Sequence, residues 1–420
     1  MTTAAARPSR ARVPALAAAG ALLLAALPAC TAEPTQRAAT SPSSSTASST
    51  TPTTTTSSTT TSPTTSATRA PSCAERVVAR LDPRGRAGQL LMVGLHSGGS
   101  SAALGAQVAD QRLGSVILLG NWGSGVSGVR SATSTLRRSA SAAGLPGLLV
   151  AADQEGGQVQ RLQGPGFSRI PSAREQGTLG PAVLRQRAAG WSRQLARAGV
   201  DVNLAPVADT VPRSLGDANE PIGALDRDFV PGSPGGNGTH AAAFVRGSLD
   251  GGVVPAVKHF PGIGRLRSNT DFSATGITDP VTSATDPYLA PFRAAVAAGS
   301  PVVMMSSARY PRLDPDRQAL FSPRVVTGLL RGDLGFDGVV VTDDVGAADS
   351  VAAVPVGERA TRFVAAGGDI VLTAEPSQAA TMLDALVDRA RTDPAFASRL
   401  RASATRVVSL KARAGLVRCG

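Results

Sequence analysis

The chain has 420 residues, 42% of them hydrophobic, and a mean hydropathy of +0.04, values that suit a globular protein with a substantial core. Aromatic residues make up 3% of the chain, and no run of consecutive lysines or arginines accompanies the net charge of +12, which argues against a protein that binds nucleic acid. Beyond the N-terminus there is no stretch of about 20 apolar residues, and this excludes a multi-pass membrane protein.

The first 29 residues have the parts of an export signal. Three arginines within the first twelve residues precede an uncharged stretch that ends in small residues before Cys30. The segment Leu27-Pro28-Ala29-Cys30 resembles a bacterial lipobox, in which the cysteine receives a diacylglycerol. We therefore expect residues 1–29 to be removed and Cys30 to anchor the protein in the outer face of the bacterial cell membrane. Ordinary cleavage followed by secretion is the alternative.

Residues 30–72 differ in composition from the rest of the chain. Between Thr40 and Thr68, 24 of 29 residues are serine or threonine. Such a sequence has too few apolar side chains to bury, so it stays solvated and extended. We expect it to be a disordered tether that joins the lipid anchor to a folded domain of residues 73–420.

Two further cysteines, Cys73 and Cys419, lie at opposite ends of the predicted domain. In an exported protein this arrangement favours a disulfide between them. The bond would close a loop of about 350 residues and contribute roughly 4–5 kcal/mol on the chain-entropy model. It would also require the two ends of the domain to lie together, as they do in a closed barrel.

From Cys73 onward, short apolar runs alternate with helical patterns, which is typical of βα units around a parallel sheet. The eight runs cover residues 90–94, 115–119, 148–152, 200–205, 253–258, 302–305, 339–342 and 369–372. Helices are predicted at 181–198, at 288–298 and after Ser322-Pro323. Two more, at 378–390 and 394–414, are expected to complete an outer ring. Eight units predict an α/β fold, a TIM (β/α)8 barrel forming one catalytic domain without a C-terminal second domain.

Polar side chains follow five of the predicted strands. In a barrel these positions converge on one mouth, where the loops carry the chemistry. We therefore predict a functional site there. The residues concerned are Asp153, Asn203 and Asp209, Lys258 and His259, Ser306 and Ser307, and Asp343 and Asp344.

Competing motifs are weak. Residues 123–128 spell Gly-x-Gly-x-x-Gly, but no acidic residue follows about 20 positions later to hold a ribose. The three histidines, His96, His240 and His259, lack metal-ligand spacing, and we interpret His96 and His240 as surface residues. No serine lies in a Gly-x-Ser-x-Gly elbow. The sequence therefore indicates no metal, no organic cofactor and no serine hydrolase.

Two long motifs carry a family resemblance. The segment of residues 151–161, Ala-Ala-Asp-Gln-Glu-Gly-Gly-Gln-Val-Gln-Arg, and the segment of residues 258–262, Lys-His-Phe-Pro-Gly, resemble glycoside hydrolase family 3. The likeness runs from about Gln89 to Leu372 and is greatest to single-domain bacterial β-N-acetylglucosaminidases (β-hexosaminidases) of cell-wall turnover. It implies a retaining exo-hydrolase that removes terminal β-linked N-acetylglucosamine from wall-derived glycans, with no cofactor.

The resemblance also implies roles for individual residues. Asp343 matches the carboxylate that attacks the anomeric carbon. Ionised groups on rigid strand ends bind neutral sugar hydroxyls through charge-assisted hydrogen bonds, and nearby cations would keep Asp343 ionised. The residues that match those holding the terminal sugar are Asp153, Arg161, Arg227, Lys258 and His259.

The proton donor of the reaction departs from the family pattern. The resemblance leads us to expect Asp-Ser-His on the loop after Lys-His-Phe-Pro-Gly, but residues 269–273 read Asn-Thr-Asp-Phe-Ser. Asp271 can be matched, whereas Ser273 stands at the histidine position and a hydroxyl cannot deliver a proton as imidazolium does. Ile263 and Ser307 also replace expected histidines. Larger members borrow a glutamate from a following domain, which we do not expect here.

Three interpretations of this gap stay open. Asp271 itself could be the acid, with a pKa raised by Asp343 and by partial burial. His259 or His96 could reach the leaving oxygen. Hydrolysis could also be slow or absent, which would make the protein a catalytically impaired glycan-binding lipoprotein. A β-glucosidase-type exo-glycosidase is a further alternative.

Overall fold

The computed structural model describes residues 70–417 of the chain. These residues belong to the second of two compact units, Thr68–Gly420. The predicted signal peptide of residues 1–29, the lipidation site Cys30, most of the tether and Cys419 lie outside the described residues. Cys73 is described and is disulfide-bonded, but its pairing with Cys419 stays a prediction. Within residues 70–417, every helix is either too short or too polar to span a bilayer.

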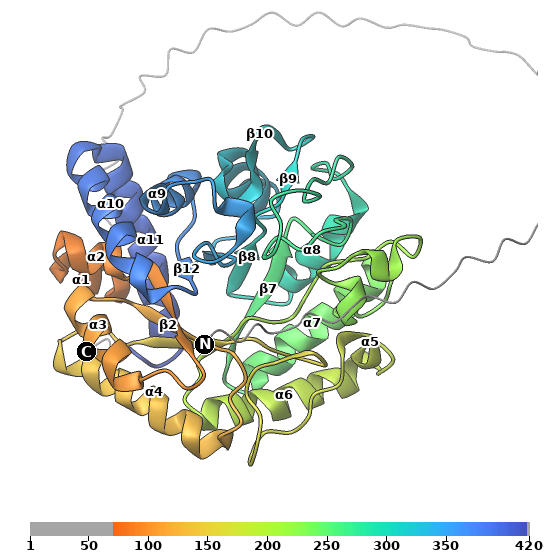
Figure 1. The fold of residues 1–420 in the computed structure, drawn as a ribbon, viewed down its shortest axis with the longest axis horizontal. Coiled ribbons are helices and arrows are strands. Elements are labelled where there is room, and N and C mark those ends of the chain that lie inside the picture. Colours follow the sequence, from red (N-terminus) through yellow and green to blue (C-terminus); the bar gives the residue numbers. More distant parts are fainter. Residues whose placement is uncertain (1–69, 418–420) are drawn as a thin grey trace, which may run out of the picture. The chain divides into compact units, whose positions relative to one another are not determined.

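Eight parallel strands form a closed barrel (Figure 1). They are β1 (Leu91–His96), β2 (Ser115–Leu119), β3 (Leu149–Ala152), β6 (Val202–Asn203), β7 (Val254–Phe260), β8 (Val302–Met305), β11 (Val339–Thr342) and β12 (Val371–Thr373). Their order is β11-β8-β7-β6-β3-β2-β1-β12, and a parallel bridge from Val341 to Ile370 closes the ring. The predicted TIM (β/α)8 barrel is confirmed.

Five strands, β1, β3, β6, β7 and β12, differ from their predicted bounds by one or two residues at an end, and two of these differences bear on the site. β6 is shorter than predicted at both ends, spanning Val202–Asn203 against residues 200–205, and Pro206 beyond it has no N–H to donate. Pairing resumes beyond it as a bridge between Val207 and Lys258. β7 begins one residue later and ends two residues later than predicted, so that His259 lies within the strand.

Helices surround the strands in Figure 1. They are α1 (Cys73–Arg80), α2 (Pro83–Gly88), α3 (Ser101–Gln111), α4 (Gly125–Ala142), α5 (Ala173–Gln176), α6 (Pro181–Arg197), α7 (Pro234–Asp250), α8 (Ala290–Ala297), η5 (Arg324–Asp333), α9 (Val356–Ala366), α10 (Ala379–Thr392) and α11 (Pro394–Arg413). The predicted start after Ser322-Pro323 is confirmed, since Ser322 Oγ accepts the Val325 N–H at 3.2 Å.

The loops between these units contain short hairpins and single helical turns. Two hairpins follow strands of the barrel: β4 (Gln154–Gly156) with β5 (Val159–Gln160), and β9 (Arg309–Tyr310) with β10 (Asp314–Gln318). The single turns are η1 (Gly216–Ala218), η2 (Gly223–Leu225), η3 (Pro287–Leu289), η4 (Ala319–Phe321), η6 (Asp349–Val351) and η7 (Pro376–Gln378).

Successive side chains along each strand point alternately into the barrel and out toward the helices, and they pack in two apolar layers. On β2, for example, Ile117 belongs to a cluster inside the barrel, whereas Val116 and Leu118 pack in the larger cluster beneath the helices. The interior cluster includes side chains from all eight strands or their immediate continuations, such as Leu204 and Ile370. The barrel is therefore a packed core, and a ligand can bind only at its ends.

Helix α11 does more than complete the outer ring. Its Val407 and Leu410 belong to the interior cluster. The buried Lys411 ammonium donates to Gln89 Oε1, to Pro146 O at 3.2 Å and to Gly147 O at 2.9 Å. Burial lowers the pKa of Lys411 to about 7, although the Asp201 carboxylate opposes this. Because these acceptors precede β1 and β3, α11 covers the end of the barrel where the strands begin.

We expect Lys411→Met to lower the free energy of unfolding by about 1–3 kcal/mol, because it leaves buried carbonyl oxygens without a donor. Urea denaturation measures the change. Arg413→Met, on the same helix but exposed, is the matched control and should have little effect. Equal losses in both variants would mean that the Lys411 contacts do not stabilise this end of the barrel.

Candidate active site

A cavity of about 580 Å³ opens at the end of the barrel where the strands finish. Asp153, Arg161, Asp271 and Asp343 all line it. Apolar side chains from the barrel interior also line it, among them Ile117. The structure thus brings together acidic and basic residues that are up to 190 positions apart in the chain.

Beside this cavity, four charged side chains form a buried ionic cluster. Lys258 Nζ lies 2.5 Å from Asp153 Oδ1 and 2.6 Å from Glu155 Oε1. Arg227 binds the same Glu155 carboxylate through two hydrogen bonds, of 2.8 and 2.9 Å. The Lys258 side chain is 3% exposed and that of Glu155 is 6% exposed, so each charge depends on its partners rather than on water.

The pKa values of this cluster follow from its charges. Burial opposes the ionised form of Glu155, but Arg227 and Lys258 outweigh it and hold the pKa of that carboxyl well below its usual range. Burial likewise opposes the charged forms of Lys258 and Arg227, and the facing carboxylates nevertheless raise the pKa values of both. All three groups are therefore ionised at neutral pH.

His259 is held by a separate buried carboxylate. Its Nδ1 lies 2.7 Å from Asp209 Oδ2, and Asp209 also accepts the Ile263 N–H at 2.8 Å. The other ring nitrogen, Nε2, lies 3.4 Å from Arg227 Nη2 and 4.0 Å from Asp343 Oδ2. This geometry fits a ring that donates from Nδ1 to Asp209 and accepts from Arg227 at Nε2.

The two aspartates after β11 have different surroundings. Asp343 lines the cavity, and its Oδ1 accepts the Asp344 N–H at 2.9 Å. The Asp344 carboxylate accepts three backbone N–H groups, those of Gly346, Ala347 and Ala374. Burial raises the pKa of Asp344. Asp344 also lines the cavity, but its oxygens are engaged by the turn. The Asp343 carboxylate accepts one hydrogen bond among the described residues and is the more available of the two to a ligand.

Asp271 reaches the same cavity from the loop after β7. Its backbone oxygen accepts the Asp349 N–H at 3.1 Å, and this ties the loop to the segment after Asp343. The side chain keeps contact with solvent. Partial desolvation and the negative charge of Asp343 together raise the pKa of Asp271 to about 6, against the opposing charges of His259 and Arg227.

The positions where histidines were expected have local structural roles. Ser273 Oγ donates to Thr275 O at 2.8 Å and accepts the Thr275 N–H at 3.1 Å, which closes a turn. Ile263 is buried, and Ser307 Oγ lies 2.8 Å from Ser350 Oγ. None of the three lines the cavity. On the loop after β7, Asp271 is therefore the residue whose side chain lines the cavity and can exchange a proton.

Two other predicted residues can be placed at this mouth. Arg161 lines the cavity, and its guanidinium has no hydrogen-bond or ion-pair partner among the described side chains. His96 lines the cavity as well and is exposed, with Nε2 3.1 Å from Ala374 O. The interpretation of His240 as a surface residue is wrong: the ring is 9% exposed and lies between Gly236 O and Leu179 O, at 2.8 and 3.0 Å.

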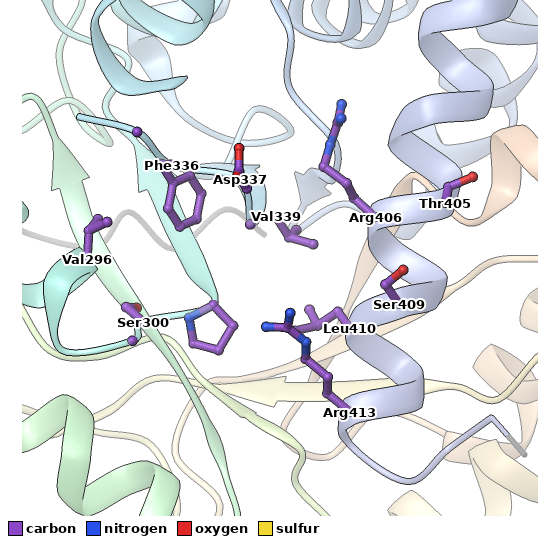
Figure 2. Close-up of a pocket in the computed structure, with 14 residues that line it drawn as sticks. Val296, Ser300, Phe336, Asp337, Val339, Thr405, Arg406, Ser409, Leu410 and Arg413 are labelled. Carbon is purple, nitrogen blue, oxygen red and sulfur yellow. The ribbon is translucent and has the colours of Figure 1, made fainter. Parts of the chain in front are cut away.

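A second cavity, of about 410 Å³, lies at the opposite end of the barrel (Figure 2). Ser300 and Val339, at the starts of β8 and β11, line it together with Arg406 and Arg413 of α11. Asp337 is the one carboxylate among its lining residues. A reaction that needs two carboxylates has no place there, so the mouth with Asp271 and Asp343 is the candidate active site.

Sequence reasoning assigned no role to Glu155, and it placed Asp209 at the mouth without a partner or a specific role. Glu155 lies two residues after Asp153, and Asp209 follows β6. Each is an acidic residue close to a strand end. Their partners, Arg227 and Lys258 for Glu155 and His259 for Asp209, lie at least 50 positions away in the chain. Within residues 70–417, no group of three or more histidine, cysteine, aspartate or glutamate side chains is arranged to hold a metal ion.

Comparison with known proteins places the chain among carbohydrate-active proteins. Residues 84–410 match the family described as "Glycosyl hydrolase family 3 N terminal domain". A β-hexosaminidase of Stenotrophomonas maltophilia is 35% identical over 248 residues, which cover 57% of this chain and 71% of that relative. The family match spans every strand of the barrel.

Solved structures of similar fold extend this likeness. A β-N-acetylhexosaminidase from Beutenbergia cavernae has 44% identity and a TM-score of 0.76, covering 80% of this chain and 99% of its own. A family 3 β-N-acetylglucosaminidase from Paenibacillus sp. str. FPU-7 has 28% identity and a TM-score of 0.72, covering 80% of this chain and 63% of its own.

Glu155→Gln should lower the free energy of unfolding by about 3–5 kcal/mol at pH 7, because it leaves buried cations short of a counter-charge. The deficit relative to wild type should be complete above the pKa of an unfolded glutamate, about 4.3, and should shrink as the pH falls below it. Urea denaturation at several pH values measures this. Asp217→Asn, at a side chain 80% exposed, is the control. A deficit independent of pH would contradict the charge argument.

Proposed function

The chain belongs to glycoside hydrolase family 3, a family of glycosidases, and we propose that it removes terminal β-linked N-acetylglucosamine from glycans, with Asp343 as nucleophile and retention of configuration. The observation that carries the proposal is that Asp343 and Asp271 line one cavity. In most retaining glycosidases two such carboxyl groups share the work, one attacking and one transferring the proton. The choice of sugar is supported by the β-N-acetylhexosaminidase and β-hexosaminidase relatives.

Substrate binding is assigned to the ionic cluster and its neighbours. Asp153, which lines the cavity, and Lys258 bind each other. Arg161 also lines the cavity, and its guanidinium has no partner among the described residues. Such groups exchange hydrogen bonds with sugar hydroxyls that are stronger than those between neutral groups. Because Arg227 and Lys258 are fixed by Glu155 before a sugar arrives, little ordering is needed on binding. His259 is the remaining proposed contact to the terminal sugar.

The first chemical step forms a covalent glycosyl-enzyme. An ionised Asp343 oxygen attacks the anomeric carbon while the bond to the leaving oxygen breaks, and the protonated Asp271 donates its proton to that oxygen. In the second step Asp271, now ionised, takes a proton from water. The water oxygen attacks the anomeric carbon, and the bond to Asp343 breaks. The two inversions give net retention.

Asp271 suits the acid role better than either histidine. Both ring nitrogens of His259 already face protein groups, Asp209 on one side and Arg227 on the other. His96 lines the cavity but directs Nε2 to a backbone carbonyl. Asp271, in contrast, has a pKa raised to about 6 and is close enough to Asp343 to respond to its charge. A carboxyl group with a raised pKa is the usual means by which an active site keeps a general acid protonated near neutral pH.

The proposed setting is the outside of a bacterial cell. The basic and apolar N-terminal segment and Cys30 support export and a lipid anchor, with secretion as the alternative. Behind the anchor, the Ser/Thr-rich tether would let the barrel reach glycans released from the cell wall. A glycan-binding protein without turnover remains the alternative from a different class, and a β-glucosidase-type activity the alternative within the enzymes.

Initial rates on the paired nitrophenyl N-acetylglucosaminide and nitrophenyl glucoside test the reaction and its sugar. We expect hydrolysis of the first at least about tenfold faster than of the second. A 2-fluoro glycoside should leave a stable adduct on Asp343, found by peptide mass spectrometry, and Asp343→Asn should form none. Binding without turnover or adduct would favour the glycan-binding alternative, and preference for the glucoside would favour the β-glucosidase.

Asp271→Asn should abolish hydrolysis of an unactivated disaccharide while sparing an aryl glycoside far more, because a good leaving group needs little protonation. The loss on the disaccharide should be about 10²–10⁴-fold. In the wild type, kcat/KM for the disaccharide should fall as the pH rises through about 6, where Asp271 loses its proton. His96→Gln is the control that tests His96 as the acid, and it should leave hydrolysis of the disaccharide nearly unchanged. Equal losses on both substrates in Asp271→Asn would remove this residue from the acid role.

A further inference from the structure

One aromatic side chain at the mouth of the cavity has no role in the reaction described so far. Phe272 is 79% exposed, the most of any large hydrophobic residue in the described part of the chain; Val281, the next, is 47% exposed. Phe272 also lines the catalytic cavity. Exposed apolar side chains that occur singly on a surface need no explanation. Phe272 differs from these because it lies at the rim of a binding cavity, where it can contact a ligand.

The position of Phe272 relative to the acid defines which part of a substrate it would meet. It follows Asp271 directly, and the turn is held by hydrogen bonds from the Phe272 N–H to Asn269 O, at 3.2 Å, and from the Asp271 N–H to Asn269 Oδ1, at 3.0 Å. An acid that protonates the glycosidic oxygen lies on the side of the leaving group. The ring beside it therefore lies where the leaving sugar departs.

Asp349 adds a polar group to the same rim. Its N–H donates to Asp271 O at 3.1 Å, so the two loops meet next to the acid. Its side chain is exposed and lines the cavity, and the carboxylate has no partner among the described residues. The Asp344 carboxylate, by contrast, accepts hydrogen bonds from three backbone N–H groups. Asp349 is thus free to accept hydrogen bonds from a ligand.

Together these two side chains match the two surfaces of a sugar ring. A pyranose has an apolar face of C–H groups, which packs on an aromatic ring, and an edge of hydroxyls, which donate to a carboxylate. We propose that Phe272 and Asp349 form a subsite for the leaving sugar, so that the enzyme acts on glycans in which the released group is itself a sugar. The inference rests on the proposed glycosidase function and adds the recognition of the second ring.

The test compares two substrates that share the terminal sugar and differ in the leaving group. The first is the β-linked disaccharide of N-acetylglucosamine, and the second is N-acetylglucosaminyl fluoride, which has no leaving ring. For Phe272→Ala and for Asp349→Asn, kcat/KM on the disaccharide should fall about tenfold, mainly through KM, as expected for one lost stacking or hydrogen-bonding contact. On the fluoride, both variants should stay within about twofold of wild type.

Control variants separate recognition from loop structure. Phe272→Trp should keep the disaccharide activity, because it keeps an aromatic face. Val281→Ala, at an exposed apolar residue that does not line the cavity, should change neither rate. Equal losses on disaccharide and fluoride would show that the variants disturb Asp271 or the fold and would overturn the subsite, as would unchanged rates on both. A wild type inactive on both substrates would overturn the proposed function, and the subsite with it.

Discussion

The architecture of the mouth depends on the Lys258 ammonium, which lies almost wholly buried between the carboxylates of Asp153 and Glu155. A buried cation without such partners would be strongly destabilising, so the three groups have to be placed together. Lys258 comes from β7, and the two acids follow β3. The Glu155 carboxylate then fixes Arg227, and Arg227 lies against His259. One buried charge thereby sets the positions of groups from three separate segments around the cavity.

Two carboxyl groups at the cavity differ because their surroundings differ. Asp343 stands at the end of a strand, close to the His259 ring that Asp209 holds in place. Asp271 stands on a loop, where partial desolvation and the negative charge of Asp343 raise its pKa. The family pattern for the proton donor is absent from this loop. The geometry nevertheless supplies a carboxyl group with a pKa suited to proton transfer.

The two ends of the barrel are specialised in opposite ways. At the end where the strands begin, α11 inserts Val407 and Leu410 against the interior cluster, and Lys411 binds the carbonyls of the adjoining loops. At the other end the loops leave a cavity above the same apolar interior. The rigid, covered end supports strands whose far ends hold charged groups at fixed positions, which is the requirement for a preorganised site.

The sequence by itself determined the barrel and most of the site, because both follow from local patterns. Alternating apolar runs mark the strands, and parallel strands bring their carboxyl ends to one mouth. The positions of Asp153, Lys258, His259 and Asp343 at that mouth therefore follow from the sequence alone. Only the tertiary structure decided which partners these residues have. Glu155 and Asp209 gain their roles from cations and a ring far away in the chain, and His240 is buried by the packing of α7. The raised pKa of Asp271 comes from desolvation at the cavity and from the charge of Asp343. Such pairings depend on distances through space, which spacing along the chain does not encode.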